Sequence, residues 1–599
     1  MYFSSIESGK LTLGGYPGSL IKMIVEKEYL DKEKYHLFAS QFKLHSDFKG
    51  SWRGEFWGKF VRGAVECYKA NKDERLYKII EESVFEIISY VEEDGTLSSY
   101  TEEYRLTGWD IWSRKYAMLG LLSYLEIAKS KSKKRKVLNS IKKQANSIMA
   151  CVGRGKNKKG ILETSNVYGS LNSASLLGVY VLLYSLTGIK KYLSFAKYIV
   201  STGLCAKQNI IKSTFKKDSY PYQWESTKAY EMIECFQWLL RYGLIINDDY
   251  YVQAAVNFVH KVYESDFTII GGLGTESEFF NHSSLTQTSI PSKQGLETCV
   301  TVSFMGLCDD LLKATGDSFY ASLIETMSYN ALFGATNDED QKMNLAEGRV
   351  WKEEGGYTTP AHEQFFFDSY TPLVNGRRAK LVGGFMVLQD GRSYGCCAAN
   401  GGYGLGLVRD FALLKKENGF VINFYSDFKA NLTIDDKKVS FSLKANLFRN
   451  GKIKIKVKGD DTFFSLSLRV PTWGIPVVTL NGSKIDGKKE KGYFVIDRTW
   501  GEDLLCLDFA LPVEAHYLND KIAFTRGPIV LSRDERLGDV SLPIARKDNY
   551  KFKVIKNDSF KNNETVVLDN DYKFCDFASS AKNMDDLNSK LSVWIDIKK

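Results

Sequence analysis

Histidine, proline and cysteine are all scarce in this sequence. The 599 residues include six histidines, ten prolines and ten cysteines. Ten cysteines in so long a chain do not make a disulfide scaffold, so we expect free, reduced thiols. Six histidines also leave few candidates for a catalytic imidazole.

Long apolar runs, a leader-like start and a basic stripe are absent as well. No run of 18 apolar residues occurs, so we expect no membrane-spanning helix. The first residues lack a basic start followed by an apolar stretch, which predicts no signal peptide and a cytoplasmic protein. The net charge of +9 is spread over many lysines, and the one dense basic run, 129–136, fits an exposed loop. Because no basic stripe is interleaved with aromatic residues, we expect no nucleic-acid partner.

The residues that are abundant are those of an ordinary globular protein. Hydrophobic residues make up 44% of the chain and charged residues 26%. A chain of this length exceeds a single hydrophobic core, so two to four domains are expected. Aromatic residues, at 13%, suit sugar-binding clefts, but composition alone favours their use in large cores.

The N-terminal two-thirds of the chain repeats a helix-like segment, a short polar or glycine break, and a second helix-like segment. The segments carry apolar residues at three- and four-residue spacing, which is typical of packed helices. A period near 58 residues accommodates two helices and two connections, so we expect stacked helical hairpins. The breaks lie near Lys72, Ser130, Gly188, Asn247 and Gly316, and are 58, 58, 59 and 69 residues apart.

This count gives twelve helices, the first near 19–30 and the twelfth near 404–416. Twelve helices in six hairpins predict an (α/α)6 barrel over 16–417, with an open solenoid as the alternative. After Asn418 the segments alternate apolar and polar residues and are separated by NG, DG and GD turns, which predicts β-structure. We expect a β-sandwich domain over 418–515 and a second β-domain over 516–599. The N-terminal segment, 1–15, can add a strand to these sheets.

The loops before the even-numbered helices share one rim of such a barrel, because these helices run parallel. Any loop that enters a helix tends to be polar, but these loops also place Trp57, Trp109 and Trp112 beside arginine and glutamate. We therefore predict a single ligand-binding mouth. Its six segments are 51–59, 108–116, 166–175, 222–231, 296–299 and 393–400.

Three thiols and a carboxylate stand at two of these helix entries. Glu297 and Cys299 precede the tenth helix, and Cys396 and Cys397 precede the twelfth. Zinc takes four tetrahedral ligands, and side chains two residues apart in an extended loop can reach one ion. Adjacent cysteines are an unusual ligand pair, so buried structural cysteines are the alternative. A cysteine at a helix N-terminus has a lowered pKa, and a bound zinc ion deprotonates it.

A candidate proton donor lies in the loop just ahead of Glu297. The stretch 271–284 offers Glu276 and Glu278. A carboxyl group beside the apolar Phe279 and Phe280 can have a raised pKa and act as a general acid. Two solvated loop glutamates are the alternative.

Together these motifs resemble those of glycoside hydrolase family 127, the β-L-arabinofuranosidase-like proteins. The similarity covers most of the chain, and E-T-C (297–299) followed by CC-x-x-N (396–400) is its most specific part. The other shared motifs are WRGEFWGK near the start, GG-x-G followed by E-x-F (271–280), Tyr-Thr-Pro-Leu (370–373), LRVPTW (468–473), LNG (480–482) and FTRGPIVLS (524–532).

The resemblance implies a retaining hydrolase that acts on a furanoside from a plant or bacterial oligosaccharide. It matches Cys396 to a nucleophile that forms a thioglycosyl intermediate, and Glu297, Cys299, Cys396 and Cys397 to zinc ligands. It matches Glu278 to the acid/base, but the gap to Glu297 is longer than the family pattern, so Glu276 stays open. The family also implies an (α/α)6 barrel with β-sandwich domains, and often a homodimer.

Further substrate contacts are predicted at the mouth, where the chain also departs from the family. Trp57 and Tyr370 are the predicted contacts that follow the motifs. Arg114, Ser173 and Lys228 stand where family members carry sugar-contacting histidines. Ala398 and Ala399 replace the proline pair that follows the two cysteines. We expect the chemistry to persist and the specificity to differ.

The two cations among these replacements suggest an acidic sugar. Arg114 and Lys228 stay charged at pH 7, and two cations in a partly dry cleft are costly unless they are paired. Internal partners are available nearby in Asp110 and Glu225. Otherwise the partner is an anion on the ligand, such as a sugar carboxylate, which arginine binds through two parallel hydrogen bonds.

Two other functions compete with a hydrolase. An epimerase or lyase on the same barrel needs a histidine or tyrosine base, and the histidine-poor rim argues against it. A non-catalytic carbohydrate-binding protein would keep its fold without zinc.

Overall fold

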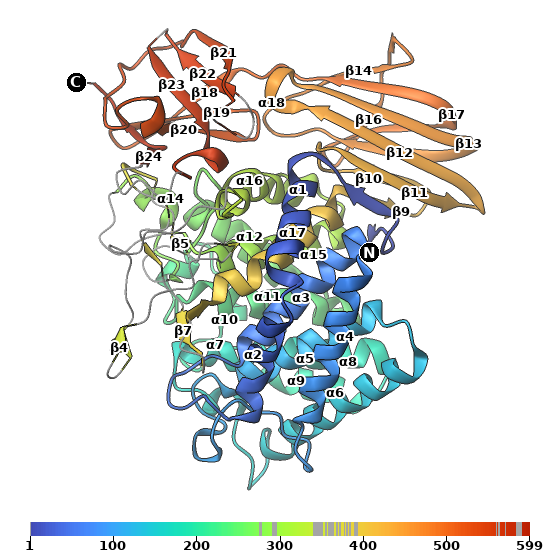
Figure 1. The fold of residues 1–599 in the computed structure, drawn as a ribbon, viewed down its shortest axis with the longest axis vertical. Coiled ribbons are helices and arrows are strands. Elements are labelled where there is room, and N and C mark those ends of the chain that lie inside the picture. Colours follow the sequence, from blue (N-terminus) through green and yellow to red (C-terminus); the bar gives the residue numbers. More distant parts are fainter. Residues whose placement is uncertain are drawn as a thin grey trace.

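A helical domain carries two β-domains on one side, next to each other, in the computed structural model of the chain (Figure 1). The structure describes residues 2–274, 278–289, 296–338, short stretches between 352 and 388, 393–558, 560, 564–569, 571–582 and 590–598. The helical domain followed by β-domains confirms the predicted fold class.

Six long helices form the inner layer of the helical domain. Most residues of these helices are buried, so the helices are covered around most of their circumference and not on one face only. Neighbours in the layer pack against each other, and α17 packs on both α15 and α3, which closes the ring. The inner helices are α3 (Glu55–Asn71), α5 (Asp110–Ile127), α8 (Leu177–Thr187), α11 (Ala229–Ile246), α15 (Thr298–Thr315) and α17 (Cys396–Ala412).

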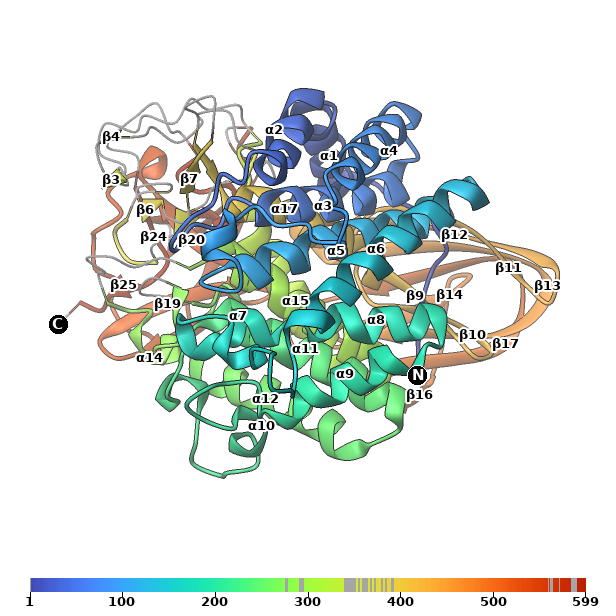
Figure 2. The ribbon, with the colours of Figure 1, turned by 90° about the horizontal axis from the view of Figure 1, so that it is seen from below.

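Amphipathic helices form the outer layer, as Figure 2 shows for α4, α6, α9 and α12 around the inner helices. They are α1 (Gly15–Ile24), which continues as a π-helical turn (Val25–Tyr29), α2 (Lys32–Lys43), α4 (Glu74–Ser89), α6 (Lys131–Cys151), α9 (Lys190–Ser201), α12 (Asp249–Asp266) and α16 (Ser318–Thr326). The short helices are α7 (Leu171–Ala174), α10 (Ile210–Ser213), α14 (Ser283–Thr286) and α18 (Leu447–Asn450).

The predicted breaks are the turns between an inner helix and the next outer helix. Four inner helices end on a residue in the left-handed conformation, whose backbone N–H bonds the preceding turn. Aspartates cap three of the outer helices that follow, each accepting a hydrogen bond from a backbone N–H two residues on. The left-handed residues are Lys72, Gly188, Asn247 and Gly316, and the capping aspartates are Asp73, Asp248 and Asp317.

The last inner helix begins eight residues earlier than the sequence predicts. Helix α17 starts at Cys396, whereas the apolar spacing predicts a start near Gly404. Its first turns are rich in glycine, which weakens a helix signal but lets neighbouring side chains approach closely. A Cβ at Gly402 would lie 1.8 Å from the Tyr29 hydroxyl, and one at Gly406 would lie 2.2 Å from the Cβ of Glu66. The sequence count also omits α2, an additional outer helix.

The first β-domain is an eleven-stranded, mainly antiparallel sheet that includes two strands from the N-terminal segment. β1 pairs with β9, and β2 pairs with β11. Its strands are β1 (Ser4–Ser5), β2 (Leu11–Leu13), β9 (Leu413–Lys416), β10 (Gly419–Ile422), β11 (Phe428–Ile434), β12 (Lys437–Asn446), β13 (Lys452–Arg469), β14 (Val477–Leu480), β15 (Ser483–Lys484), β16 (Lys488–Glu490) and β17 (Tyr493–Asp508).

The second β-domain is an eight-stranded antiparallel sheet. Its strands are β18 (Val513–Leu518), β19 (Lys521–Arg526), β20 (Ile529–Asp534), β21 (Phe552–Lys556), β22 (Glu564–Leu568), β23 (Tyr572–Asp576), β24 (Leu591–Ser592) and β25 (Ile595–Asp596). Three two-stranded ladders precede α17: β3 (Lys352–Glu353) with β4 (Gly356–Tyr357), β5 (Ser369–Tyr370) with β6 (Leu381–Val382), and β7 (Phe385–Val387) with β8 (Ser393–Gly395).

The LRVPTW motif fastens the first β-domain to the helical domain. Arg469 at the end of β13 donates to one carboxylate oxygen of Glu325 in α16, and the Trp473 indole N–H donates to the other at 2.8 Å. The Arg469 and Glu325 side chains are almost completely buried. Both oxygens of this carboxylate are therefore satisfied by the chain itself.

One segment of the described residues, Tyr168–Thr187, is long and apolar enough by composition to cross a membrane. It contains α7 and the inner helix α8, and 72% of the apolar window is buried inside the protein. Its apolar residues therefore pack in the core of the barrel.

Candidate functional site

Two inner helices begin side by side and bring the predicted ligand residues together. Glu297 is the N-cap of α15 and Cys299 lies in its first turn, while Cys396 and Cys397 open α17. One side-chain atom from each of the four residues lies within 4.8 Å of the others, and all four residues are buried. Segments about a hundred residues apart thus form one cluster.

The spacing of the cluster suits a tetrahedral metal ion. The Cys396 and Cys397 sulfurs are 3.9 Å apart, and the Cys397 sulfur is 3.9 Å from a carboxylate oxygen of Glu297. Tetrahedral zinc with Zn–S bonds of about 2.3 Å places its sulfur ligands about 3.8 Å apart. The backbone N–H of Cys299 points at the Cys397 sulfur, at 3.4 Å, as expected where a helix begins.

Glu297 supplies a second observation that favours a cation. Its Oε2 atom is buried and has no hydrogen-bond partner among the described residues. Burial raises the pKa of this carboxyl well above its usual range. An unsatisfied carboxylate oxygen is costly to bury, and a bound cation would satisfy it. The donor set of three thiols and one carboxylate also fits zinc.

The three thiols differ in acidity because they compete for ionisation in one small space. Burial raises the pKa of Cys299, but hydrogen bonds from Cys396 and Cys397 outweigh it, and the pKa falls to about 7. The hydrogen bond to Cys299 raises the pKa of Cys396, and burial raises that of Cys397. Cys299 is therefore the most acidic thiol of the three.

A buried lysine that the sequence analysis missed lies beside the cluster. Lys59 of α3 places its ammonium group 3.8 Å from the Cys299 sulfur and 2.9 Å from Glu55. It also lies 4.6 Å from the centre of the Tyr230 ring. The signal was the E-x-x-x-K spacing in WRGEFWGK, which places both side chains on one helix face. A fixed positive charge at this distance stabilises a thiolate.

The predicted acid/base and one predicted rim cation form an ion pair. Lys228, at the start of α11, donates to Glu278, and its ammonium group is 4.0 Å from Glu231. Backbone pairing between Lys228 and Phe279 holds the two segments together. The Glu278 side chain is 19% exposed and Lys228 is buried, so the carboxyl lies nearer to solvent. The partner of Lys228 is Glu278 and not the Glu225 expected from the sequence.

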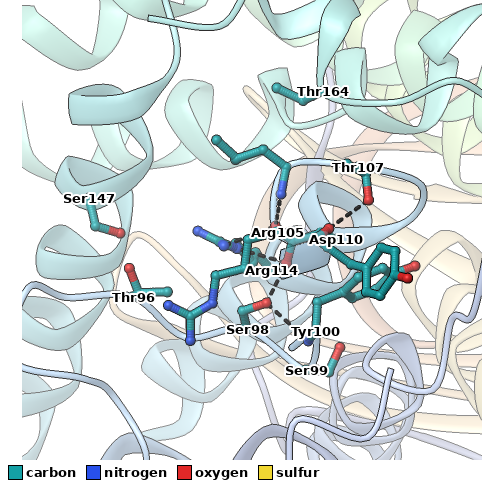
Figure 3. A network of polar contacts seen from close by, with 12 residues as sticks. Thr96, Ser98, Ser99, Tyr100, Arg105, Thr107, Asp110, Arg114, Ser147 and Thr164 are labelled. Carbon is teal, nitrogen blue, oxygen red and sulfur yellow. Dashed lines mark hydrogen bonds and ion pairs between the residues drawn. The ribbon is translucent and has the colours of Figure 1, made fainter. Parts of the chain in front are cut away.

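Arg114 is bound to its own helix, as Figure 3 shows. Its Nε donates to Asp110 at 3.0 Å, and a terminal nitrogen lies 2.9 Å from the second oxygen of Asp110. The Ser98 hydroxyl and the Leu106 backbone N–H complete the bonds to this carboxylate. Both predicted rim cations are therefore paired with protein carboxylates. This pairing removes the basis of the acidic-sugar hypothesis.

Two tryptophans of the predicted mouth, one of them the predicted contact Trp57, are completely buried. Trp57 is completely buried and donates to the Ser83 hydroxyl of α4, so it packs between the two helical layers and not at the mouth. Trp112 is also completely buried, but it bonds Glu55 and its ring lies 5.4 Å from that of Tyr230, so it packs beside Lys59 and Tyr230. A tryptophan in the first turns of an inner helix can point to the outer layer or toward the cluster, and its position in sequence does not reveal the direction.

The structure gives fewer contacts for the remaining predicted residues. Ser173 is buried in α7 and accepts a hydrogen bond from the Thr164 hydroxyl at 2.9 Å. The backbone of Tyr370 pairs with Leu381, and its side chain lies outside the described part of the structure, as does the whole of Glu276.

Two more buried acceptors in this region have no hydrogen-bond partner among the described residues, although the Lys228 ammonium group lies 4.0 Å from one of them. They are Oε2 of Glu231, in the first turn of α11, and Oδ1 of Asn400, one turn after Cys396. The Asn400 amide nitrogen lies 3.5 Å from the Tyr230 hydroxyl. Sugar hydroxyls are hydrogen-bond donors, so these acceptors fit a neutral sugar better than an anion.

Comparisons with known proteins bear on the family and the fold of the chain. The sequence model of the glycoside hydrolase family 127 β-L-arabinofuranosidase catalytic domain matches residues 20–348, and that of the middle domain matches 419–512. A search of curated protein sequences finds no match.

Among solved structures, a GH127 β-arabinofuranosidase is 17% identical, with a TM-score of 0.76 over 100% of this chain and 98% of its own. A GH127 β-L-arabinofuranosidase from Geobacillus stearothermophilus T6 is 18% identical, with a TM-score of 0.72 over 98% of this chain and 100% of its own. At this identity the structures show a shared fold across the whole chain.

Proposed function

The chain belongs to glycoside hydrolase family 127, and from this premise we propose that it is a retaining, zinc-dependent β-L-arabinofuranosidase. The proposed substrate is an arabinofuranoside at the end of an oligosaccharide. In this proposal Cys396 is the nucleophile and Glu278 the acid/base. Glu297, Cys299, Cys396 and Cys397 hold the zinc ion.

The observation that carries the proposal is the cluster at the starts of α15 and α17. Four ligand atoms lie within 4.8 Å of one another, and one of the four residues, Glu297, has a buried carboxylate oxygen with no hydrogen-bond partner among the described residues. When bound, zinc would hold the cysteine sulfurs as thiolates at neutral pH. The cluster lies at the starts of two inner helices, on the rim where the sequence predicts the ligand-binding mouth.

The residues of the chain supply the steps of a double displacement. The Cys396 sulfur attacks the anomeric carbon as its bond to the leaving oxygen breaks, and Glu278 gives that oxygen its proton. Glu278 then takes a proton from water, the water oxygen bonds to the anomeric carbon, and the Cys396 thiolate leaves. Lys228 holds the Glu278 carboxyl in place, and Lys59 provides positive charge beside Cys299. Glu231 and Asn400 offer acceptors to sugar hydroxyls.

Hydrolysis of an aryl β-L-arabinofuranoside tests the activity, with the configuration of the first-formed sugar followed by NMR. We expect turnover with retention of the β configuration. Inversion would contradict the cysteine nucleophile, and turnover of pyranosides only would contradict the proposed substrate.

The acid/base assignment is tested by comparing leaving groups. Glu278→Gln should slow an alkyl arabinofuranoside by about 10²–10⁴-fold and an activated aryl glycoside far less, because the latter departs without a proton. Glu276→Gln is the matched control and should behave as the wild type with both substrates. If Glu276→Gln shows the leaving-group dependence and Glu278→Gln does not, the assignment is off by two residues.

A further inference from the structure

Four aromatic side chains from separate loops form a row of ring contacts that ends at Phe279, next to Glu278. The rings of Trp52 and Trp109 are 6.4 Å apart, those of Trp109 and Tyr168 5.9 Å, and those of Tyr168 and Phe279 5.6 Å. Trp52, Trp109 and Phe279 are half-buried, and Tyr168 is 38% exposed. A row of partly exposed rings beside a polar centre is typical of a ligand-binding site.

The backbone of Tyr168 adopts a conformation that non-glycine residues rarely adopt. Tyr168, Gly169 and Ser170 have φ values of 48°, 63° and 62°. Such a run is unfavourable and persists only where the surroundings impose it, which is characteristic of functional sites. Here the Ser226 hydroxyl donates to the Tyr168 carbonyl at 2.9 Å, and the Ala206 N–H donates to the Gly169 carbonyl at 2.8 Å.

The other two residues of the run fix it further. The Ser170 hydroxyl lies within hydrogen-bond distance of the Leu162 and Ser165 carbonyls, at 2.6 and 2.8 Å. A Cβ at Gly169 would lie 2.5 Å from the Cys205 sulfur, so no larger residue fits there. The strained turn therefore holds the Tyr168 ring in a partly exposed position.

The ring lies on the outer side of the proposed acid/base. Its centre is 5.2 Å from the Lys228 ammonium group, and Lys228 bonds Glu278. Exposure falls from Tyr168 at 38%, through the Glu278 side chain at 19%, to Cys396 at 7%. In a double displacement the glycone occupies the deep side, next to the nucleophile, and the leaving group occupies the outer side, next to the acid. Tyr168 thus stands where the leaving group would lie.

We propose that Tyr168 is the platform for the leaving group and that Trp109 and Phe279 form the walls of this subsite. The leaving group is then itself a sugar ring, whose C–H face packs on the tyrosine ring, and not a small alcohol. This inference rests on the proposed function and adds the residues that bind the leaving sugar.

The test compares two substrates that share a glycone, an arabinofuranosyl disaccharide and methyl β-L-arabinofuranoside. Tyr168→Ala should lower kcat/KM for the disaccharide about tenfold or more, since loss of a stacked ring costs roughly this factor. For the methyl glycoside the change should stay within about twofold. Tyr168→Phe keeps the ring and should retain the wild-type ratio of the two values.

Tyr263→Ala is the matched control, because Tyr263 is 44% exposed on the outer helix α12 and should leave both values unchanged. Equal losses for the two substrates in Tyr168→Ala, or no loss for either, would overturn the platform while leaving the proposed function intact. Absence of turnover of both glycosides by the wild type would overturn the proposed function and the platform with it.

Discussion

Two buried glutamates on successive helices, Glu325 in α16 and Glu297 at the start of α15, have opposite surroundings. Glu325 is 1% exposed, and both its oxygens are bound by Arg469 and Trp473 of the first β-domain. Glu297 is 2% exposed, and its Oε2 atom has no partner among the described residues. Three thiols lie close to it, and the cations Lys228 and Lys59 act on it without a hydrogen bond to its Oε2 atom.

The difference separates a structural charge from a functional one. A carboxylate whose bonds are all made by its own chain stabilises the fold only if the whole set stays together. Burying a carboxylate oxygen that has no hydrogen-bond partner is costly unless an ion or ligand from outside the chain binds it. We therefore expect changes near Glu325 to act on stability and changes near Glu297 to act on metal binding and catalysis.

The largest effect is expected for a change in the cysteine cluster beside Glu297. Cys396→Ser should lower kcat by about 10³-fold or more, because a serine hydroxyl is not ionised at neutral pH. Steady-state kinetics with an aryl arabinofuranoside measures this loss, and thermal unfolding reports whether the fold remains. Cys151→Ser is the matched control, since that thiol is exposed and distant in sequence from the cluster. Activity retained in Cys396→Ser would remove cysteine from the mechanism.

For a change beside Glu325, the expected effect is on the stability of the fold. Arg469→Met leaves the Glu325 charge buried without its partner and should lower the free energy of unfolding by about 3–5 kcal/mol. Denaturant titration measures this loss, and kcat per folded molecule should remain near the wild-type value. In Arg449→Met, which alters an exposed arginine 3.9 Å from Glu564, the change should stay within about 0.5 kcal/mol. If Arg469→Met abolished turnover without destabilising the fold, the separation between the two glutamates would fail.

A smaller effect is expected for Arg114, which lies near the predicted mouth but is bound to Asp110 of its own helix. Arg114→Ala should cost about 1–3 kcal/mol of stability, because Asp110 keeps its bonds from Ser98 and Leu106. The ratio of kcat/KM for a neutral furanoside to that for its carboxylated analogue should not change. A selective loss of activity on the carboxylated analogue would restore the acidic-sugar hypothesis.

The sequence predicts the fold well where local signals agree with the packing. The breaks at Lys72, Gly188, Asn247 and Gly316 are marked by residues that end helices, and the structure places helix ends there. The start of α17 is predicted late because its glycines serve close contacts with other helices, which no local pattern reveals. The homodimer and the cytoplasmic location stay predictions.

The candidate site could also be predicted from the sequence only in part. The two helix entries that carry the cysteines are visible in the sequence, and the structure brings them together. The pairing of Lys228 with Glu278, the burial of Trp57 and the strained turn at Tyr168 depend on side-chain direction and on distant loops. Charge and residue type alone therefore suggested an acidic ligand, whereas the contacts show internally paired cations.

The most direct test of the account is the metal content of the purified protein. Elemental analysis should find about one zinc ion per chain in protein prepared without chelators, and Cys299→Ala should lose most of it. Cys151→Ala should keep the full amount, since its thiol lies outside the cluster. A native protein without zinc, or an unchanged zinc content in folded Cys299→Ala, would contradict the metal centre formed by Glu297, Cys299, Cys396 and Cys397.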